Sequence, residues 1–322
     1  MTMKNSTPNQ FTGYHAPDYR FRFHIRSISH RALFLPIGMK KHPKIIRLIK
    51  GESPLSVFNC QSIHEARKAF NQLRKRFDFA YWAISDYRIR HIDDADNIVP
   101  LCLNRYQHHI IDTMQKRHSL RKTSRYVITK SFPQCGLTTC VQAYIIWLQY
   151  FHCANNSCTY SSGDVTLNPL KANLLRHFGK DTVSTAKKIP LRGLDWSAHF
   201  NSFRSPDAGR GINFGYIHFA DMSKWKDPDG QLSARAARAA VSGVLLEYFT
   251  LVVFEGNIPP ADRFPFQSYR DLDLEYNTKI HLFSPLARNP YFLAHTVLAS
   301  SQPADSHLIH LHLDPSLVDS QT

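Results

Sequence analysis

The spacing of apolar residues predicts three helices along this chain. Residues 62–76 and 103–122 repeat an apolar residue every three or four positions, which is the period of a helix with one buried face. Residues 140–151 are apolar almost throughout, which is typical of a helix enclosed by other elements. The polar face of the first predicted helix carries Lys and Arg, so this face either stays in solvent or contacts a polyanion.

Runs of aromatic and β-branched residues predict strands at 126–129, 214–220 and 246–257. Residues 19–50 alternate aromatic and aliphatic side chains with Arg, His and Lys, and this alternation predicts strands with one basic face. The first 20 or so residues are rich in Ser, Thr, Asn and Pro, and we expect them to form a loose arm.

A strand, a tight loop and a helix follow one another between residues 126 and 151, which is the order that a phosphate-binding loop requires. In such a loop, backbone N–H groups and the helix N-terminus face the phosphates, a Lys adds charge, and a Ser or Thr hydroxyl holds Mg²⁺. Here Gly136 stands where the backbone must approach the phosphates closely, and Thr138 and Thr139 open the helix.

Two residues depart from the phosphate-loop pattern G-x-x-x-x-G-K-[ST]. Ser131 replaces the first glycine and Leu137 replaces the lysine. Lys130, at the end of the strand, is a candidate for the missing positive charge. The alternative is an ordinary strand–turn–helix junction in which Gly136 is a turn residue.

Polar groups also follow two strands further along the chain. Asp221 follows strand 214–220, and strand 246–257 ends in Glu255, Gly256 and Asn257. A carboxylate at the end of a buried strand either coordinates metal through water or polarises the water that attacks a phosphate. Because ligands of α/β folds bind where parallel strands end, these strand ends and the loop predict one shared binding edge.

Composition and charge indicate a folded protein with a polyanionic partner. The chain has 322 residues, of which 43% are hydrophobic and 13 are glycine, so a disordered or collagen-like chain is excluded. The net charge is +15, and residues 1–130 carry all of it, with 24 Lys and Arg against 9 Asp and Glu. A basic segment joined to a neutral one favours nucleic acid as the partner, with a solvated basic surface as the alternative.

Cysteine usage and hydropathy favour a cytoplasmic protein. The six cysteines form no C-x-x-C pair and the N-terminal sequence is polar, so we expect a reducing compartment. The two C-x-x-x-x-C spacings do not favour zinc. The longest apolar run, 141–151, is too short to cross a bilayer, so we expect no membrane span.

Four segments, taken in order, resemble the ATPase domain of the large terminase subunit, the DNA-packaging motor of tailed phages. LNRYQHHII (103–111) is similar to the adenine-recognition motif, and KSFPQCGLTT (130–139) is similar to the variant Walker A loop. SPDAGRG (205–211), with the strand that leads to Asp221, resembles the Walker B region. The strand end 255–257 stands where the family has its coupling motif, and the resemblance extends from about residue 79 to about residue 292.

The resemblance implies an α/β fold of the P-loop NTPase class (ASCE, RecA-like), with a central, mostly parallel sheet flanked by helices. It also implies three parts: a basic N-terminal arm and subdomain (1–78), the ATPase domain (79–292) and a short C-terminal tail (293–322). That tail is too short for the nuclease domain of large terminases, so we expect no nuclease activity from these residues.

The resemblance also implies that ATP and Mg²⁺ bind between the loop and the strand ends. Asp221 would orient the attacking water, Lys130 would supply charge, and Arg210 would either contact phosphate as an arginine finger or cap its loop. Thr138 and Asp221 would hold Mg²⁺, Gln107 would bind adenine, and Asn257 would sense the γ-phosphate. The other expected nucleotide contacts are Ser131, Gln134, Cys135, Gly136, Leu137 and Thr139.

The implied function is ATP-driven translocation of double-stranded DNA during phage genome packaging, in the cytoplasm of the host. The implied partners are double-stranded DNA, a small terminase subunit, a portal protein and further copies of the chain. Pro133 and Leu137 stand where the family loop has Arg or Lys, and Ala220 stands at the metal-associated position before Asp221. These departures favour an alternative in which a degenerate terminase fold serves as a DNA-binding or assembly module. A further alternative is a basic α/β domain unrelated to packaging.

Overall fold

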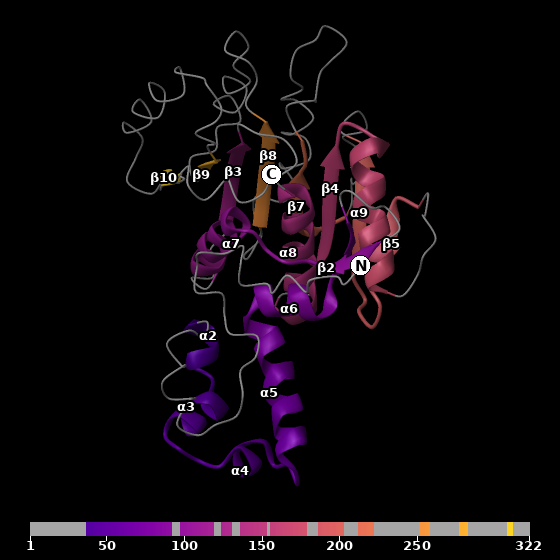
Figure 1. Cartoon of the computed structure of the whole chain (residues 1–322). Coiled ribbons are helices and arrows are strands. Elements are labelled where there is room, and N and C mark those ends of the chain that lie inside the picture. The colour runs from indigo at the N-terminus through magenta and orange to yellow at the C-terminus, as the bar shows by residue number, and fades with distance from the viewer. Residues whose placement is uncertain are drawn as a thin grey trace, which may run out of the picture. The chain divides into compact units, whose positions relative to one another are not determined.

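The computed structural model describes ten stretches of the chain (Figure 1). They are residues 37–91, 97–118, 124–130, 136–152, 155–178, 186–202, 212–221, 251–257, 277–282 and 308–311. The chain forms two compact units, residues 1–109 and 110–322. Helix α7 (Arg105–His118) crosses from the first unit into the second, and its position agrees with the helix predicted over 103–122.

The described part of the first unit is mostly helical. Its elements are α2 (Ile37–Lys40), α3 (Pro43–Ile49), α4 (Pro54–Phe58), α5 (Ile63–Phe77), α6 (Phe79–Asp86), and the antiparallel pair β1 (Arg88–Arg90) and β2 (Ile98–Pro100). The predicted helix over 62–76 is confirmed by α5, whose apolar face packs into one hydrophobic cluster. That cluster consists of Met39, Ile45, Leu48, Val57, Phe58, Ala66 and Phe70.

The prediction of strands over residues 19–50 is wrong for residues 37–49, which form α2 and α3. Pro43 begins α3 with a φ suited to a helix, and the His42 side chain accepts a hydrogen bond from the Lys44 N–H. Ile45 and Leu48 lie three positions apart and are both buried in the cluster, so a helix buries this short apolar pair well. Residues 19–36 lie outside the described residues.

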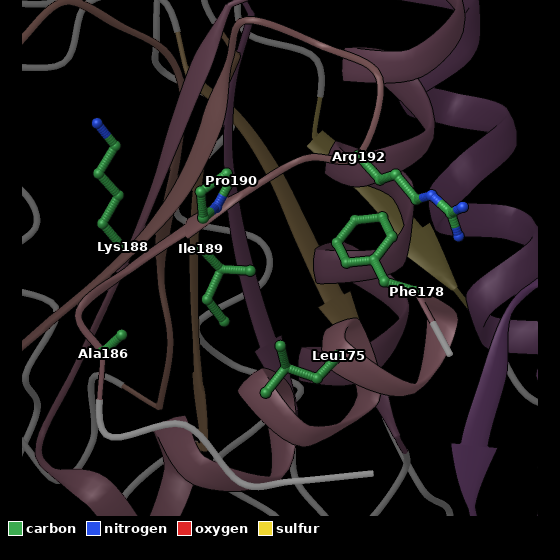
Figure 2. Close-up of a pocket in the computed structure, with 7 residues that line it drawn as sticks. All are labelled: Leu175, Phe178, Ala186, Lys188, Ile189, Pro190 and Arg192. Atoms are coloured by element: carbon green, nitrogen blue, oxygen red, sulfur yellow. The ribbon is translucent and has the colours of Figure 1, made fainter. Parts of the chain in front are cut away.

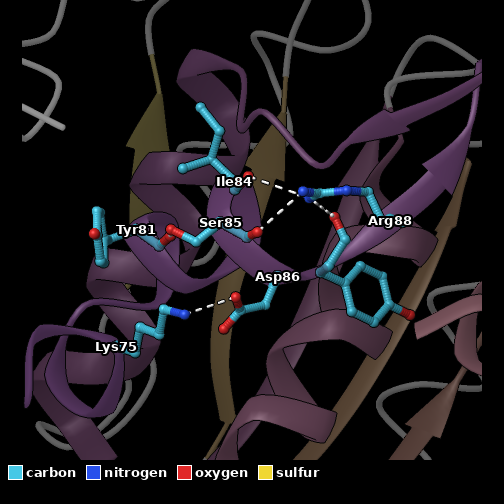
Figure 3. Close-up of polar contacts among 7 residues, drawn as sticks. Lys75, Tyr81, Ile84, Ser85, Asp86 and Arg88 are labelled. Atoms are coloured by element: carbon cyan, nitrogen blue, oxygen red, sulfur yellow. Dashed lines mark hydrogen bonds and ion pairs between the residues drawn. The ribbon is translucent and has the colours of Figure 1, made fainter. Parts of the chain in front are cut away.

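Polar contacts connect the last turn of α5 to both ends of α6. Asp78 follows α5 and caps α6, because its Oδ1 accepts a hydrogen bond from the Tyr81 N–H. Lys75 of α5 forms a 2.7 Å ion pair with Asp86 at the end of α6 (Figure 3). Arg88 donates hydrogen bonds to the carbonyl oxygens of residues 84, 85 and 87, which occupies acceptors that the end of a helix leaves open.

The second unit is built on an eight-stranded sheet in the order β10-β9-β3-β8-β7-β4-β6-β5 (Figure 1). Its strands are β3 (Ser124–Lys130), β4 (Asn156–Ser161), β5 (Lys188–Pro190), β6 (Ser197–Ser202), β7 (Phe214–Phe219), β8 (Leu251–Asn257), β9 (Asn277–Leu282) and β10 (Leu308–Leu311). Every neighbouring pair is parallel except β5 and β6. The expected α/β class with a mostly parallel sheet is therefore confirmed, and the strands predicted at 126–129 and 214–220 correspond to β3 and β7.

Helices α8 (Leu137–Phe151) and α9 (Asp164–His177) pack against the sheet and contact each other. Eleven of the fifteen residues of α8 are buried, as its nearly continuous apolar sequence predicts. Two of them are glutamines that hold the helix in place. The Gln142 amide donates to the carbonyl oxygen of Leu170 in α9, and the Gln149 amide donates to that of Asn155 before β4.

Aromatic side chains form a ladder across the sheet near the strand ends. Tyr160 of β4 stacks on Phe219 of β7 with ring centres 5.5 Å apart, and Phe219 stacks on Phe254 of β8 at 4.7 Å. These residues are in register, so one face of the sheet is apolar across three strands. Among the described residues, no helix is both long enough and apolar enough to span a membrane.

Candidate functional site

Three neighbouring parallel strands end at one edge of the sheet. In register, Lys130 at the end of β3 is the backbone partner of Asn257 at the end of β8. β7 pairs with the other side of β8, with Phe219 opposite Phe254, and Asp221 follows β7 two residues later. The structure therefore brings the backbone positions of three predicted site residues to one edge. We call this edge, together with the first turn of α8, the strand-end site.

Gly136 directs the chain from the loop after β3 into α8. Its φ is +65°, which is a left-handed conformation that glycine adopts without a Cβ penalty. Leu137 is only 1% exposed, so the side chain that stands in place of the expected lysine is a core residue. Thr138 and Thr139 are half-buried in the first turn, where backbone N–H groups have no acceptor within the helix.

A polar contact at the strand-end site joins α8 to β8. The Thr138 hydroxyl donates a hydrogen bond to Oε1 of Glu255, although 117 positions separate the two residues. Glu255 is completely buried. The Nε2 atom of His218, in β7, lies 3.7 Å from the same carboxylate oxygen and is also completely buried. A hydroxyl and an imidazole from different elements thus converge on one carboxylate.

Asp221 lies where the chain turns away from the sheet. The Ala220 N–H still pairs with the Tyr160 carbonyl oxygen of β4 at 2.8 Å, and Asp221 then adopts a φ of +55°. A positive φ is uncommon outside glycine, although Asp tolerates it better than most residues, and such strain is concentrated at functional sites. Asp221 is 8% exposed, so this charged residue is largely buried.

Burial keeps two side chains of β4, Cys158 and Tyr160, in their protonated form. Burial raises the pKa of the Cys158 thiol to about 12, and it raises the pKa of the Tyr160 hydroxyl well above its usual value. Both side chains contact Asn201 or each other, so they form a protonated polar group inside the sheet. Burial disfavours the thiolate of Cys158, which is the reactive species of a cysteine nucleophile.

Gln107, the residue expected to bind adenine, belongs to the first compact unit. Its Oε1 accepts a hydrogen bond from the Asn104 N–H, and Asn104 Oδ1 accepts one from the Gln107 N–H, both at 3.0 Å. This reciprocal pair is a capping box at the start of α7. The role of Gln107 toward adenine stays a prediction. Four further predicted residues lie outside the described residues: Ser131, Gln134, Cys135 and Arg210.

The sequence placed Glu255 at the end of the strand predicted over 246–257 but gave a nucleotide role there only to Asn257. It did not single out His218. The available signal was an acidic residue within an otherwise apolar strand, since residues 251–256 are all buried. Such a residue needs a polar partner, and the sequence does not say which element provides it.

A pocket lies along the edge strand β5, away from the strand-end site (Figure 2). It is lined by Leu175 and Phe178 at the end of α9 and by residues 186–192 around β5. Its floor is apolar, with Lys188 and Arg192 at its rim. Strands β7, β4 and β6 separate β5 from β8, so this pocket is separate from the strand-end site and contains none of the predicted site residues.

Comparison with known proteins gives a likeness in structure and no match in sequence. No protein-family model matches the chain, and no curated protein matches it in sequence. Among solved structures, the chain is similar to the large terminase of a thermophilic bacteriophage, which was solved in complex with ADP. The TM-score is 0.39 at 17% sequence identity, over 57% of this chain and 48% of the terminase chain. The likeness thus spans about half the length of that terminase.

Proposed function

We propose that the chain binds ATP with Mg²⁺ at the strand-end site and uses its hydrolysis to move double-stranded DNA during phage genome packaging. The observation that carries the proposal is the contact between Thr138 and Glu255. This contact joins the helix after β3 to the neighbouring strand β8, directly beside the ends of both strands. The motif order and the resemblance of these motifs to those of large terminases supply the reaction and the DNA substrate.

The topology of the sheet supports a ligand at this place. The chain leaves β3 through α8 toward β4, which lies beyond β8 and β7 in the sheet. The next described strand after β8 is β9, which lies on the opposite side of β3. Strand order therefore reverses between β3 and β8, and α/β sheets bind ligands at the carboxyl ends of strands where this occurs. The first turn of α8 adds N–H donors suited to phosphate oxygens.

The residues present fit a nucleotide-bound Mg²⁺. The Thr138 hydroxyl and the Asp221 carboxylate are oxygen ligands, which Mg²⁺ prefers. A nucleotide-bound Mg²⁺ is held largely by phosphates and water, so one or two protein oxygen ligands are enough. The ion would neutralise charge on the phosphates. Asp221 would orient the attacking water, and Lys130 would supply the charge that Leu137 lacks.

The proposed DNA-binding role rests on the positive charge of the N-terminal part of the chain. Residues 1–130 carry all of the net charge of +15, and α5 exposes Arg67, Lys68 and Arg76. Contacts from such side chains to phosphates do not depend on DNA sequence, as translocation requires, and they weaken steeply with salt. A small terminase subunit, a portal protein and further copies of the chain complete the proposed assembly.

The test is ATP hydrolysis by the purified chain, with and without double-stranded DNA. We expect DNA to stimulate turnover, and we expect Asp221→Ala and Lys130→Ala each to abolish it. The matched controls are Asp195→Ala and Lys188→Ala, which remove the same charges from exposed positions at and after β5. Loss of turnover in the controls as well, or unchanged turnover in both site variants, would refute the assignment of the site.

A second candidate function is a catalytically degenerate terminase fold that serves as a DNA-binding or assembly module. The observation that favours it is the burial of Leu137 and Ala220, at 1% and 0% exposure. Apolar core residues thus occupy two positions where the resemblance leads us to expect polar groups. Wild-type protein that binds DNA but hydrolyses ATP no faster than the Asp221→Ala variant would support this function over the first.

A further inference from the structure

We propose that Glu255 is a positioning residue that orients the Thr138 hydroxyl toward the nucleotide-bound cation. In this way β8 supplies a carboxylate next to the end of β7, where the metal-associated position is occupied by Ala220. The inference rests on the proposed function, because it assumes that Mg²⁺ and nucleotide bind at the strand-end site.

The first step is the direction of the hydrogen bond. A threonine hydroxyl has one proton to donate and two lone pairs to accept with. The Thr138 proton is directed at Glu255, so the lone pairs of Oγ1 point away from Glu255 and remain available to a cation. An anionic acceptor also strengthens the bond and increases the negative charge on Oγ1, as outer carboxylates do for other metal-binding groups.

The second step is the place of Glu255 in the sheet. β8 lies between β3 and β7, so Glu255 comes from the middle of the three strands that end at the site (Figure 1). It pairs in register with Ile128 of β3, and it follows Phe254, which pairs with Phe219, the last residue of β7. Glu255 points to the face that α8 covers, because it accepts the hydrogen bond from Thr138 of that helix. Successive residues of a strand point to opposite faces, so Phe254 stacks on Phe219 at the other face.

The third step is the burial of the carboxyl group. Glu255 has no exposed surface and lies in a strand whose other buried residues are apolar. Removing a carboxyl group from water costs several kcal/mol unless hydrogen bonds or charges compensate, so packing alone would favour an apolar residue here. The Thr138 hydroxyl, from the helix after β3, donates to this oxygen, and the His218 imidazole of β7 lies 3.7 Å from it, beyond hydrogen-bond distance. The carboxylate is thus enclosed by the elements that form the strand-end site.

The test measures how strongly Mg²⁺ tightens the binding of ADP to the full chain. A fluorescent ADP is titrated with Mg²⁺ and again with EDTA, so that the ratio of the two Kd values reports the contribution of the cation. For Glu255→Gln, which keeps the side-chain size, we expect the EDTA value to stay unchanged and the ratio to fall by about 10-fold or more. Thr138→Val should lower the ratio similarly, and the double variant should fall no further than either single variant. Thr138→Ser, which keeps the hydroxyl, should retain the wild-type ratio.

Glu65→Gln is the matched control, because it makes the same substitution at an exposed position of α5 and should keep the wild-type ratio. A wild-type ratio in Glu255→Gln would overturn the inference and leave the proposed function standing. Equal weakening with Mg²⁺ and with EDTA would also overturn it, since it would give Glu255 a purely structural role. If Glu255→Gln does not fold, Glu255→Asp takes its place, and a wild-type ratio there, with the carboxylate drawn back by one methylene, would overturn the inference. Wild-type protein that binds no ADP under either condition would refute the proposed function itself, and the inference with it.

Discussion

Replacing Asp78 with alanine should lower the free energy needed to open helices α5 and α6 by about 3–5 kcal/mol. Asp78 Oδ2 accepts a hydrogen bond from Arg74 Nε at 2.9 Å, and Oδ1 accepts one from the Tyr81 N–H at 3.0 Å. Arg74 and Asp78 are 2% and 5% exposed, so the substitution leaves a guanidinium in the core without this carboxylate. The Arg74 guanidinium also lies over the Tyr81 ring, 4.3 Å from its centre, so the two helices share these contacts.

Two terms set the magnitude. Removing one partner of a buried ion pair costs about 3–5 kcal/mol, because the remaining charge stays in a medium of low polarity. Loss of a helix N-cap costs about 0.5–2 kcal/mol, and the two terms overlap because one side chain provides both contacts. Asp78→Asn keeps an acceptor oxygen for the Tyr81 N–H, but it removes the charge and places an amide NH₂ group against the Arg74 Nε–H donor. We therefore expect it to destabilise by about 1 kcal/mol less than Asp78→Ala.

The assay is amide hydrogen exchange followed by mass spectrometry on peptides that cover residues 63–86. A loss of about 3 kcal/mol corresponds to exchange faster by about two orders of magnitude, since about 1.4 kcal/mol is a factor of ten. Glu52→Gln is the control, because it breaks an ion pair with Arg47 whose side chains are 45% and 42% exposed, and solvent already screens that pair. Wild-type exchange in both Asp78 variants would refute the reasoning, because the buried pair would then contribute nothing net.

Three further predictions concern single residues. Burial, with a nearby lysine, lowers the pKa of His199, so the unfolded chain takes up a proton at a higher pH than the folded chain does. Stability should therefore fall as the pH drops below about 6.5, and His199→Gln should flatten this loss in urea midpoints measured between about pH 7.5 and 5.5. Gly136→Ala should lower the unfolding free energy by about 1–2 kcal/mol, because Gly136 has a left-handed φ. Gly163→Ala should be neutral in the same denaturation assay, because Gly163 lies in extended backbone with open space around it. Iodoacetamide at about pH 8 should modify the exposed Cys102 in preference to the buried Cys158, which mass spectrometry of the digested protein would read out.

Elements with a strong local signal were predictable from sequence. The helix predicted over 140–151 forms as α8, because an almost uninterrupted apolar segment after a glycine leaves few alternatives. β3 and β7 follow for a similar reason, since aromatic and β-branched residues fill both predicted strands. The strand prediction was wrong for residues 37–49 because their short apolar groups fit both the helical and the strand period. Pro43 and the burial of Ile45 with Leu48 favour a helix. That burial depends on later residues of the cluster, such as Phe70, which the local sequence does not reveal.

The partner of Thr138 could not be predicted, because sequence motifs assign each role to its own segment. At the strand-end site, α8, β8 and β7 contribute side chains beside the end of β3, and the order of these strands along the chain differs from their order in the sheet. Under the proposed function, Ala220 stands at the metal-associated position of β7, and the carboxylate that contacts the first turn of α8 comes from the neighbouring strand β8. A carboxylate from an adjacent strand could then serve a site whose own motif lacks one. On that proposal, a degenerate motif in a parallel sheet argues for lost activity only when the adjacent strand end also lacks the missing group.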